Sequence, residues 1–426
     1  MTPRFDESLT RLVDVVATKL GAEALASGVV LRDASGRLVF FSATVLAEEQ
    51  AKGLADALID ALGVYARSDR PVVSRDEPGA ERVLKDPGVR ERELPKGRIR
   101  YLDRRLVGAD WLRKPLPLTS VPARFVFASL KGGVGRSTAL SVVAAEQSRQ
   151  GKNVLVVDLD LEAPGIGSML LGGDRRPRFG SLDYLVERNF GQVGDLDAFV
   201  GTSALTAGAG LVDVVPVVGL DSLTAPENYL AKLSRAMLEG VGEDGTPTSL
   251  AEKLAGLLSE LESRRTYDLV LVDARAGLAE LAAGPLLGLG ANVLLFGTAQ
   301  TQTLEGLRFL FAHLASLIAP GTPSPWSVLK MVHAKAQQLA SQEQFRDELS
   351  ELFAEYLYEE QTSLTEFNFG PNDPDAPHSP IVVPLDLAFA DWDPTAEPSK
   401  LIATYYARTY GALLSYVDDV QRGPQS

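Results

Sequence analysis

The sequence contains no cysteine and only three histidines among its 426 residues. Without cysteine there is no disulfide, iron–sulfur cluster or thiolate zinc site. The histidines, at 313, 333 and 378, are far apart, so a histidine metal site is not expected. No apolar run approaches the roughly 18 residues that a membrane helix needs. The first residues, MTPRFDESLT, lack the basic start and apolar block of a secretory signal. These absences favour a cytoplasmic protein without a membrane partner.

The chain is also short of positive charge, with a formal net charge of −14. Broad nucleic-acid binding needs a basic surface, so this charge does not favour a nucleic-acid partner, although it leaves a local basic patch open. Residues 75–114 are the most basic stretch, densest in KGRIRYLDRR. We interpret them as a solvated charged hairpin rather than as a binding patch.

A change of pattern near residues 120–124 divides the chain into two predicted domains. Residues 1–118 contain two amphipathic helical stretches, at 6–21 and 47–66, and alternating strands at 28–43 and 99–108. They are predicted to form a small α+β domain, in which we find no catalytic motif. Residues 122–426 form the second predicted domain.

Residues 122–426 alternate short β-branched runs with helix-length segments. The runs are at 124–129, 153–160, 211–218, 267–274, 292–299, 327–334 and 379–386. Such continuous apolar strands are typical of a mostly parallel, doubly wound α/β sheet with helices on both faces. Ligands bind at the carboxyl ends of the strands in this architecture, so the site is expected where these runs stop.

The stretch SLKGGVGRST, residues 129–138, follows the first of these strands and precedes a helix. Its three glycines let the backbone wrap a phosphate with the N–H groups pointing inward, and the helix N-terminus adds further donors. Ser137 is placed to coordinate Mg²⁺ through its hydroxyl. Glycines can also serve packing alone, but the flanking strand and helix favour a phosphate-binding loop. The expected binding residues are Lys131, Gly132, Gly133, Val134, Gly135, Arg136, Ser137 and Thr138.

KGGVGRST resembles the deviant Walker A loop of the ParA/MinD ATPase family, with the pattern K-G-G-x-G-K-[ST]. The resemblance implies a P-loop fold that binds ATP and Mg²⁺ and a homodimer that encloses the nucleotide. It also implies that Lys131 reaches the phosphates of the partner subunit. Arg136 stands where the family has lysine. Arginine keeps the charge but differs in shape, so ATP binding is expected to survive while hydrolysis slows.

Carboxylates end two of the predicted strands. Asp158 and Asp160, in NVLVVDLD, lie on the same side of an extended chain. This pair resembles the second motif of the family, which implies that Asp160 orients the attacking water and Asp158 supports Mg²⁺. Asp273 follows YDLVLV in the place of a Walker B aspartate that holds Mg²⁺. With Lys131 and Arg136, Asp160 completes the set of catalytic residues that the resemblance implies.

Three further features leave alternatives open. Arg275, in DARAG, either contacts the γ-phosphate or pairs with a nearby acid. Gln300 is a candidate nucleotide sensor, but a helix cap at Thr301 or Thr303 is favoured for this stretch. The C-terminal segment from residue 398 is amphipathic but carries Asp418 and Asp419, so we expect it to pack on the ATPase domain rather than bind membrane. Its tyrosines are accordingly interpreted as packing residues.

The leading hypothesis is a slow or partner-stimulated ATPase that acts as a nucleotide-dependent dimerisation switch, coupled to a protein partner through residues 1–118. Arg136 supports an alternative, an ATP-binding assembly or signalling protein with little hydrolysis. A small-molecule ligase or kinase on the same fold is a less favoured alternative, because no second-substrate motif is evident.

Overall fold

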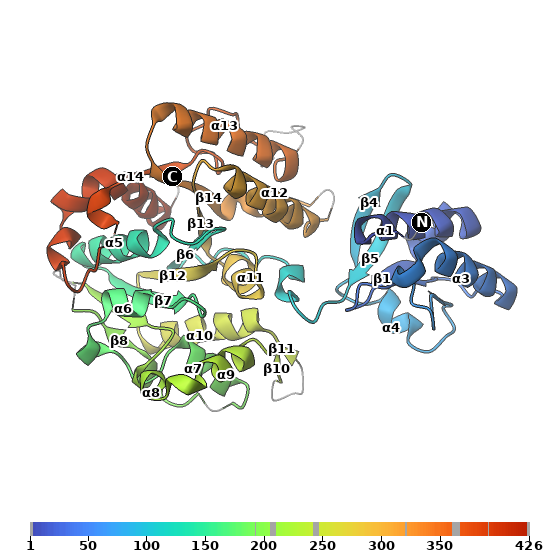
Figure 1. The fold of residues 1–426 in the computed structure, drawn as a ribbon, viewed down its shortest axis with the longest axis horizontal. Helices are drawn as coiled ribbons and strands as arrows, with labels where there is room; N and C mark the ends of the chain where they lie inside the picture. Colours follow the sequence, from blue (N-terminus) through green and yellow to red (C-terminus); the bar gives the residue numbers. More distant parts are fainter. Residues whose placement is uncertain are drawn as a thin grey trace. The chain divides into compact units, whose positions relative to one another are not determined.

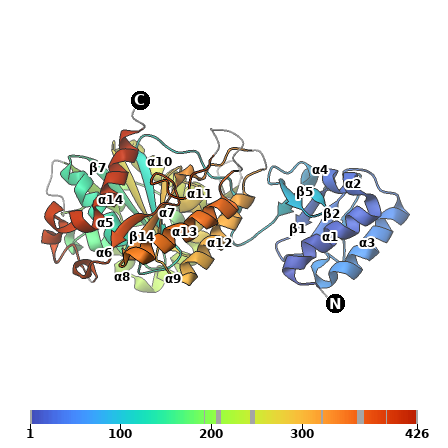
Figure 2. The same ribbon diagram turned by 90° about the horizontal axis from the view of Figure 1, so that it is seen from above.

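The computed structural model describes residues 3–191, 193–204, 210–241, 247–319, 322–359, 367–390 and 392–423 (Figures 1 and 2). The chain divides into two compact units. The first is Met1–Leu112 with Ser316–Thr322, and the second is Arg113–Ala315 with Pro323–Ser426. This division falls six residues before the end of the first predicted domain, at 118.

The first unit is built on a mixed five-stranded sheet with the order β3-β2-β1-β5-β4. β1 pairs with β2 in antiparallel and with β5 in parallel orientation, and β4 and β5 form a hairpin. The sequence therefore predicts the central strands correctly. The strands are β1 Val29–Arg32, β2 Leu38–Phe41, β3 Val72–Val73, β4 Arg90–Leu94 and β5 Gly97–Asp103; the helices are α1 Phe5–Leu20, α2 Ala22–Ser27, α3 Glu48–Leu62 and α4 Ala80–Leu84.

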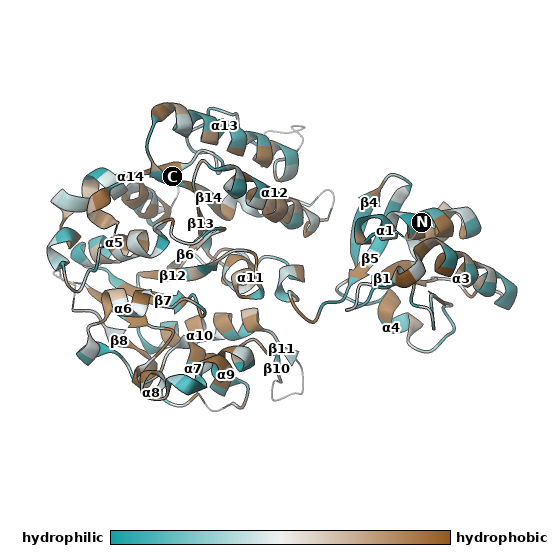
Figure 3. Ribbon diagram, in the orientation of Figure 1, coloured by the Kyte–Doolittle hydropathy of each residue, from teal (hydrophilic) through white to brown (hydrophobic). Residues whose placement is uncertain are grey.

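Apolar side chains cover both faces of this sheet. On one face α1 and α3 bury Leu12, Val16 and Leu58 against Val30 and Phe40. Both helices alternate apolar and polar residues at helical spacing, as the hydropathy colours show (Figure 3). On the other face α4 packs against alternate residues of the same strands. Alternation along β1 and β2 thus supplies two small cores from one sheet.

The second unit is built on an eight-stranded sheet with the order β15-β14-β13-β6-β12-β7-β9-β8. Seven strands run parallel, and only the two-residue β8 is antiparallel to its neighbour. All seven predicted runs are strands of this sheet, so the predicted doubly wound α/β fold is confirmed. The strands are β6 Ala123–Ser129, β7 Asn153–Leu159, β8 Gly201–Thr202, β9 Leu211–Val215, β12 Leu269–Ala276, β13 Asn292–Gly297, β14 Leu329–Ala336 and β15 Ile381–Pro384; β10 Gly240–Val241 and β11 Pro247–Thr248 form a separate ribbon.

Helices cover both faces of the large sheet. α5, α6 and α14 lie on the face that presents Phe125, Phe127 and Val156. The helices α7, α10, α11 and α13 contact the sheet or one another on the opposite side (Figure 2). Their bounds are α5 Arg136–Arg149, α6 Ile166–Leu170, α7 Ser181–Arg188, α8 Leu220–Thr224, α9 Tyr229–Ala236, α10 Leu250–Arg264, α11 Glu280–Leu287, α12 Thr301–Ser316, α13 Leu339–Tyr356 and α14 Ala403–Arg422. Among the described residues, no helix combines the length and apolar character needed to span a bilayer.

The C-terminal helix α14 packs on the sheet and on α5, as the sequence predicts. Tyr406 and Tyr410 are buried in the main core, and Tyr416 packs against it, whereas Tyr405 is half exposed. Residues 424–426 of the predicted segment lie outside the described residues. Because the apolar side of α14 covers the sheet, its tyrosines are packing residues.

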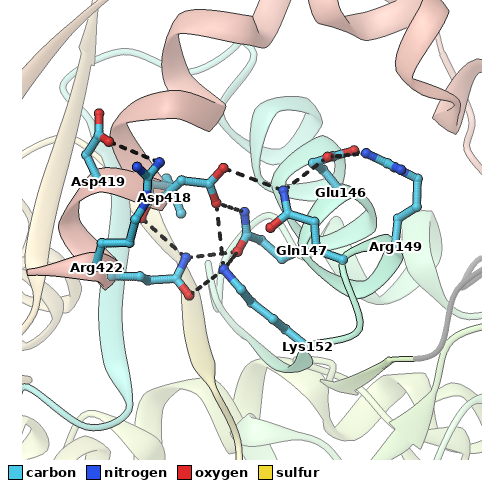
Figure 4. Close-up of polar contacts among 10 residues, drawn as sticks. Glu146, Gln147, Arg149, Lys152, Asp418, Asp419 and Arg422 are labelled. Atoms are coloured by element: carbon cyan, nitrogen blue, oxygen red, sulfur yellow. Dashed lines mark hydrogen bonds and ion pairs between the residues drawn. The ribbon is translucent and has the colours of Figure 1, made fainter.

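Polar contacts fix the far end of α14 to the end of α5. Gln147 donates to Asp418 at 2.8 Å, and Lys152 donates to Gln147 at 2.6 Å and to Gln421 at 3.0 Å (Figure 4). Gln421 donates in turn to Gln147 at 2.8 Å. We call these four side chains the α5–α14 contact network. It holds the helix that begins at the glycine-rich loop.

Candidate functional site

The predicted phosphate-binding loop joins the end of β6 to the start of α5. Gly133 and Gly135 have φ of 73° and 91°, in the left-handed region that a β-carbon disfavours. A β-carbon placed on Gly132, Gly133 or Gly135 would meet no atom within 4 Å. Glycines needed for packing would have close neighbours at this point. These three glycines therefore border open space at the N-terminus of a 14-residue helix, an arrangement that suits a phosphate.

Neighbouring strands bring the predicted carboxylates to the same edge of the sheet. β12 lies between β6 and β7, and Asp273 is directly opposite Asp158 in the register of β12 and β7. The Ser137 hydroxyl donates to Asp273 Oδ2 at 2.6 Å. The structure thus joins the hydroxyl and the aspartate that the sequence predicts as metal-binding residues, although they are 136 positions apart.

Arg136 lies beneath the loop, and its guanidinium points toward the strand ends. Its Nη2 atom lies 3.1 Å from Asp160 Oδ2, its Nε atom 3.9 Å from Asp273 Oδ1, and its Nη1 atom donates to the carbonyl of Ala274. The side chain is only 8% exposed. Arg136, at the position where the family has lysine, thus contacts the end of β12 and the residue that follows β7, and the predicted water-orienting carboxylate of Asp160 is one of its partners.

Asp158 is fully buried and accepts two backbone hydrogen bonds, from Asp160 N at 3.1 Å and Gly165 N at 3.2 Å. Burial, followed by repulsion from Asp273, raises the pKa of this carboxyl. Its contacts shape the loop 160–165. Its predicted part in supporting Mg²⁺ stays a prediction.

The residues present fit a magnesium ion held with a nucleotide. Asp273 Oδ1 is buried and, within the described part of the chain, has no hydrogen-bond partner, and burial raises the pKa of the Asp273 carboxyl. Among the described residues, Asp160 and Asp273 share the guanidinium of Arg136 as their ion-pair partner, so positive charge is scarce at this point. The described residues contain no group of three or more acids or histidines poised to enclose a metal alone. Mg²⁺ in phosphate sites needs no such enclosure, because phosphate oxygens and waters complete its coordination.

Two further contacts involve residues for which the sequence leaves alternatives. The Lys131 ammonium donates to Gln300 Oε1 at 3.1 Å, just before α12 begins at Thr301. Arg275 forms an ion pair with Glu162, which agrees with the pairing alternative. Sequence reasoning did not single out Glu162. Its position two residues after Asp160 is the only signal that could have done so.

The strand, glycine loop and helix, with aspartates at the ends of the adjoining parallel strands, have the arrangement of a P-loop. No protein-family model matches the chain. It is 29% identical over 202 residues to the chromosome-partitioning ATPase Soj of Thermus thermophilus, and the match covers 47% of this chain and 64% of Soj. The predicted resemblance to ParA/MinD-type ATPases is thus confirmed.

Solved structures of the same kind align with the chain at low identity. A ParA family ATPase from Chlorobium tepidum has a TM-score of 0.45 and 15% identity, covering 69% of this chain and 98% of its own. The cell division ATPase MinD of Pyrococcus furiosus has a TM-score of 0.43 and 16% identity, covering 70% and 98%. An ATP complex of a McdA variant from Cyanothece has a TM-score of 0.44 and 15% identity, covering 72% and 99%.

Proposed function

We propose that this protein is a cytoplasmic ATPase that binds ATP with Mg²⁺ and acts as a nucleotide-dependent dimerisation switch. The open glycine loop, with Ser137 bonded to Asp273 directly beneath it, is the observation that carries the proposal. The loop amides and the α5 N-terminus would hold the phosphates, and Ser137 and Asp273 would hold Mg²⁺, with Asp158 in support. The ion would supply charge that offsets the negative phosphates.

Lys131 is proposed to complete the site of a second subunit. Its ammonium is exposed at the rim of the loop, and its described polar contact is a single bond to a neutral amide. Such a bond is weak in water, so Lys131 can leave Gln300 at little cost in free energy. In this proposal the lysine crosses to the phosphates of the partner, and hydrolysis, with water oriented by Asp160, releases the dimer.

The experiment measures nucleotide binding and mass together. Calorimetry with ATP and ADP in Mg²⁺ reports affinity, and light scattering after size exclusion reports the oligomer. Wild type is expected to dimerise with ATP, and Lys131→Ala to stay monomeric. Lys52→Ala, an exposed lysine on α3 of the other unit, is the matched control and should behave as wild type. An identical oligomer with and without ATP contradicts the dimer switch.

A second candidate function is an ATP-bound assembly or signalling protein with little hydrolysis. The hydrogen bond from Arg136 to Asp160 favours this second function, because it engages the carboxylate that would orient the attacking water. Phosphate release by wild type and by Arg136→Lys separates the two. If Arg136→Lys raises turnover at unchanged ATP affinity, the function with little hydrolysis is supported. Fast turnover by the wild type excludes this function.

We also propose that residues 1–118 carry the protein-binding role, since this part has its own sheet and cores and none of the nucleotide residues. A pull-down with the full chain and with a chain that begins at residue 113, where the second unit starts, tests this role. Loss of the same partners from the shortened chain is the expected result, and their full retention contradicts it.

A further inference from the structure

The ion pair between Glu162 and Arg275 joins the loop that follows β7 to the last residues of the neighbouring strand β12. Glu162 lies two residues after Asp160, and Arg275 two residues after Asp273. Since β7 and β12 pair in register, the ion pair bridges the strand ends that carry the site's carboxylates. It therefore lies next to the place where a terminal phosphate and its metal would sit.

The backbone around Arg275 departs from regular strand geometry. The register of β12 with β6 shifts between Asp273 and Ala276. An irregularity of this kind changes the direction of a side chain and is common beside active sites. Gly277 follows with φ 98°, and its amide donates to Ser129 O at 2.9 Å, where the glycine loop begins. Arg275 is thus fixed by its backbone close to the phosphate-binding loop.

The two arginines of the site differ in the hydrogen-bonding capacity that they have left. The Arg136 guanidinium donates to the carbonyl of Ala274 and to Asp160. Arg275 has a side chain 25% exposed, and among the described residues its polar partner is Glu162 alone. A guanidinium has five donor hydrogens and binds phosphate oxygens through two parallel bonds. Arg275 is consequently the arginine with donors left for a phosphate.

The loop 161–165 is fixed at its ends, and its middle is held by the ion pair of Glu162 and by the Ala163 amide, which donates to Asp160 O at 3.1 Å. The Tyr229 hydroxyl donates to the carbonyl of Leu161, and the Gly165 amide donates to Asp158 at 3.2 Å. Glu162, Ala163 and Pro164 are exposed between these anchors. Breaking the ion pair would therefore release only this short segment, without unfolding its attachment points.

We infer that Arg275 distinguishes a nucleoside triphosphate from a diphosphate by exchanging Glu162 for the terminal phosphate. The ion pair is partly exposed, with side chains 25% and 38% exposed, and solvent weakens it to that extent, whereas a phosphate at the loop offers a more highly charged, bidentate partner. Binding of the triphosphate frees residues 162–164, and its hydrolysis lets the ion pair form again. This inference rests on the proposed function, because it requires that the glycine loop binds nucleotide.

Calorimetry on the full chain tests it, with Mg²⁺ and either ADP or a non-hydrolysable ATP analogue. Arg275→Ala is expected to lower the affinity for the analogue by about tenfold or more and the affinity for ADP by less than about threefold. Glu162→Gln keeps the size of the side chain but removes its charge. It is expected to raise the affinity for the analogue and to leave the affinity for ADP unchanged. Arg178→Ala, an exposed ion-paired arginine of the same unit, is the control and should change neither affinity.

Hydrogen exchange of residues 161–165 gives a readout independent of affinity and activity. The analogue, but not ADP, is expected to speed exchange in wild type, and Glu162→Gln should exchange fast without nucleotide. Equal effects of Arg275→Ala on both nucleotides, or unchanged exchange in Glu162→Gln, overturn the inference. A wild-type chain that binds neither nucleotide refutes the proposed function itself, whereas a chain that binds both with discrimination unaffected by Arg275→Ala refutes only the inference.

Discussion

Replacing Arg136 with alanine should destabilise the nucleotide-free protein far more than the loss of an ordinary surface charge. The guanidinium lies 3.1 Å from Asp160 and 3.9 Å from Asp273. The exposed fractions of these side chains are 8% for the arginine, 11% for Asp160 and 2% for Asp273. The substitution leaves the carboxylates buried without a cation.

The magnitude follows from the distances and the burial. At an effective dielectric constant of about 20, unit charges 3.1 Å apart attract by roughly 5 kcal/mol. Desolvation offsets much of that attraction while the pair is intact, but it continues to act on a carboxylate whose partner has been removed. Removing one member of a buried pair typically costs about 3–5 kcal/mol, and we expect a loss in this range for Arg136→Ala.

The loss should grow with pH. Burial raises the pKa of Asp273, and Arg136 lowers it, so removing Arg136 raises the pKa further. A carboxyl whose folded pKa lies above its unfolded value of 3.8 contributes stability at low pH that is lost as pH rises through the folded pKa. The penalty should therefore be smaller at pH 5 than at pH 8, and Mg²⁺ should reduce it at pH 8.

Urea unfolding followed by tryptophan fluorescence measures this penalty. Trp111→Phe in all variants confines the signal to Trp326 and Trp392, both in the second unit. Arg178→Ala serves as control, with an expected cost of about 0–1 kcal/mol for its exposed ion pair. A loss below about 1 kcal/mol, or the same loss at both pH values, would refute the assignment of Arg136 as the counter-charge of this cluster.

Two further predictions concern helices outside the site. Gly53 is at an exposed position inside α3, where a β-carbon meets no atom within 4 Å, so Gly53→Ala should stabilise the first unit by about 0.5–1 kcal/mol. Urea unfolding followed by Trp111 fluorescence, in a chain lacking the other tryptophans, measures this gain. A loss of stability would contradict the helical environment of this position. Leu413→Ala, which removes a fully buried side chain from α14, should cost the second unit about 2–5 kcal/mol, and a cost below about 1 kcal/mol would show that α14 is not part of the core.

The large sheet is predictable because each of its seven parallel strands is a continuous apolar run of adequate length. Four strands are not predictable in this way. β3, β8, β10 and β11 have two residues each, too few for any period to be recognised. β3 and β8 depend on neighbouring strands that offer unpaired backbone groups at the edges, and that information lies in the assembled fold.

The sequence predicts which residue types form the site and at which strand ends they lie, but not which side chains contact one another. The loop and the positions of Ser137 and Asp273 follow from local patterns. The partners of Arg136 and Arg275 depend on side-chain directions and on the bulge in β12, and these arise only when three strands pair. For the same reason the sequence left the role of Arg275 open between phosphate and acid.

The α5–α14 contact network has a consequence for the order of folding during synthesis. Gln147, near the end of the helix that starts at the glycine loop, bonds to Asp418, which is 271 residues later in the chain. That helix can form early, and Lys152 can bond to Gln147 at once, but the contacts of the helix with α14 cannot form until translation has passed residue 422. A ribosome-bound chain therefore makes the glycine loop long before the last helix can cover α5.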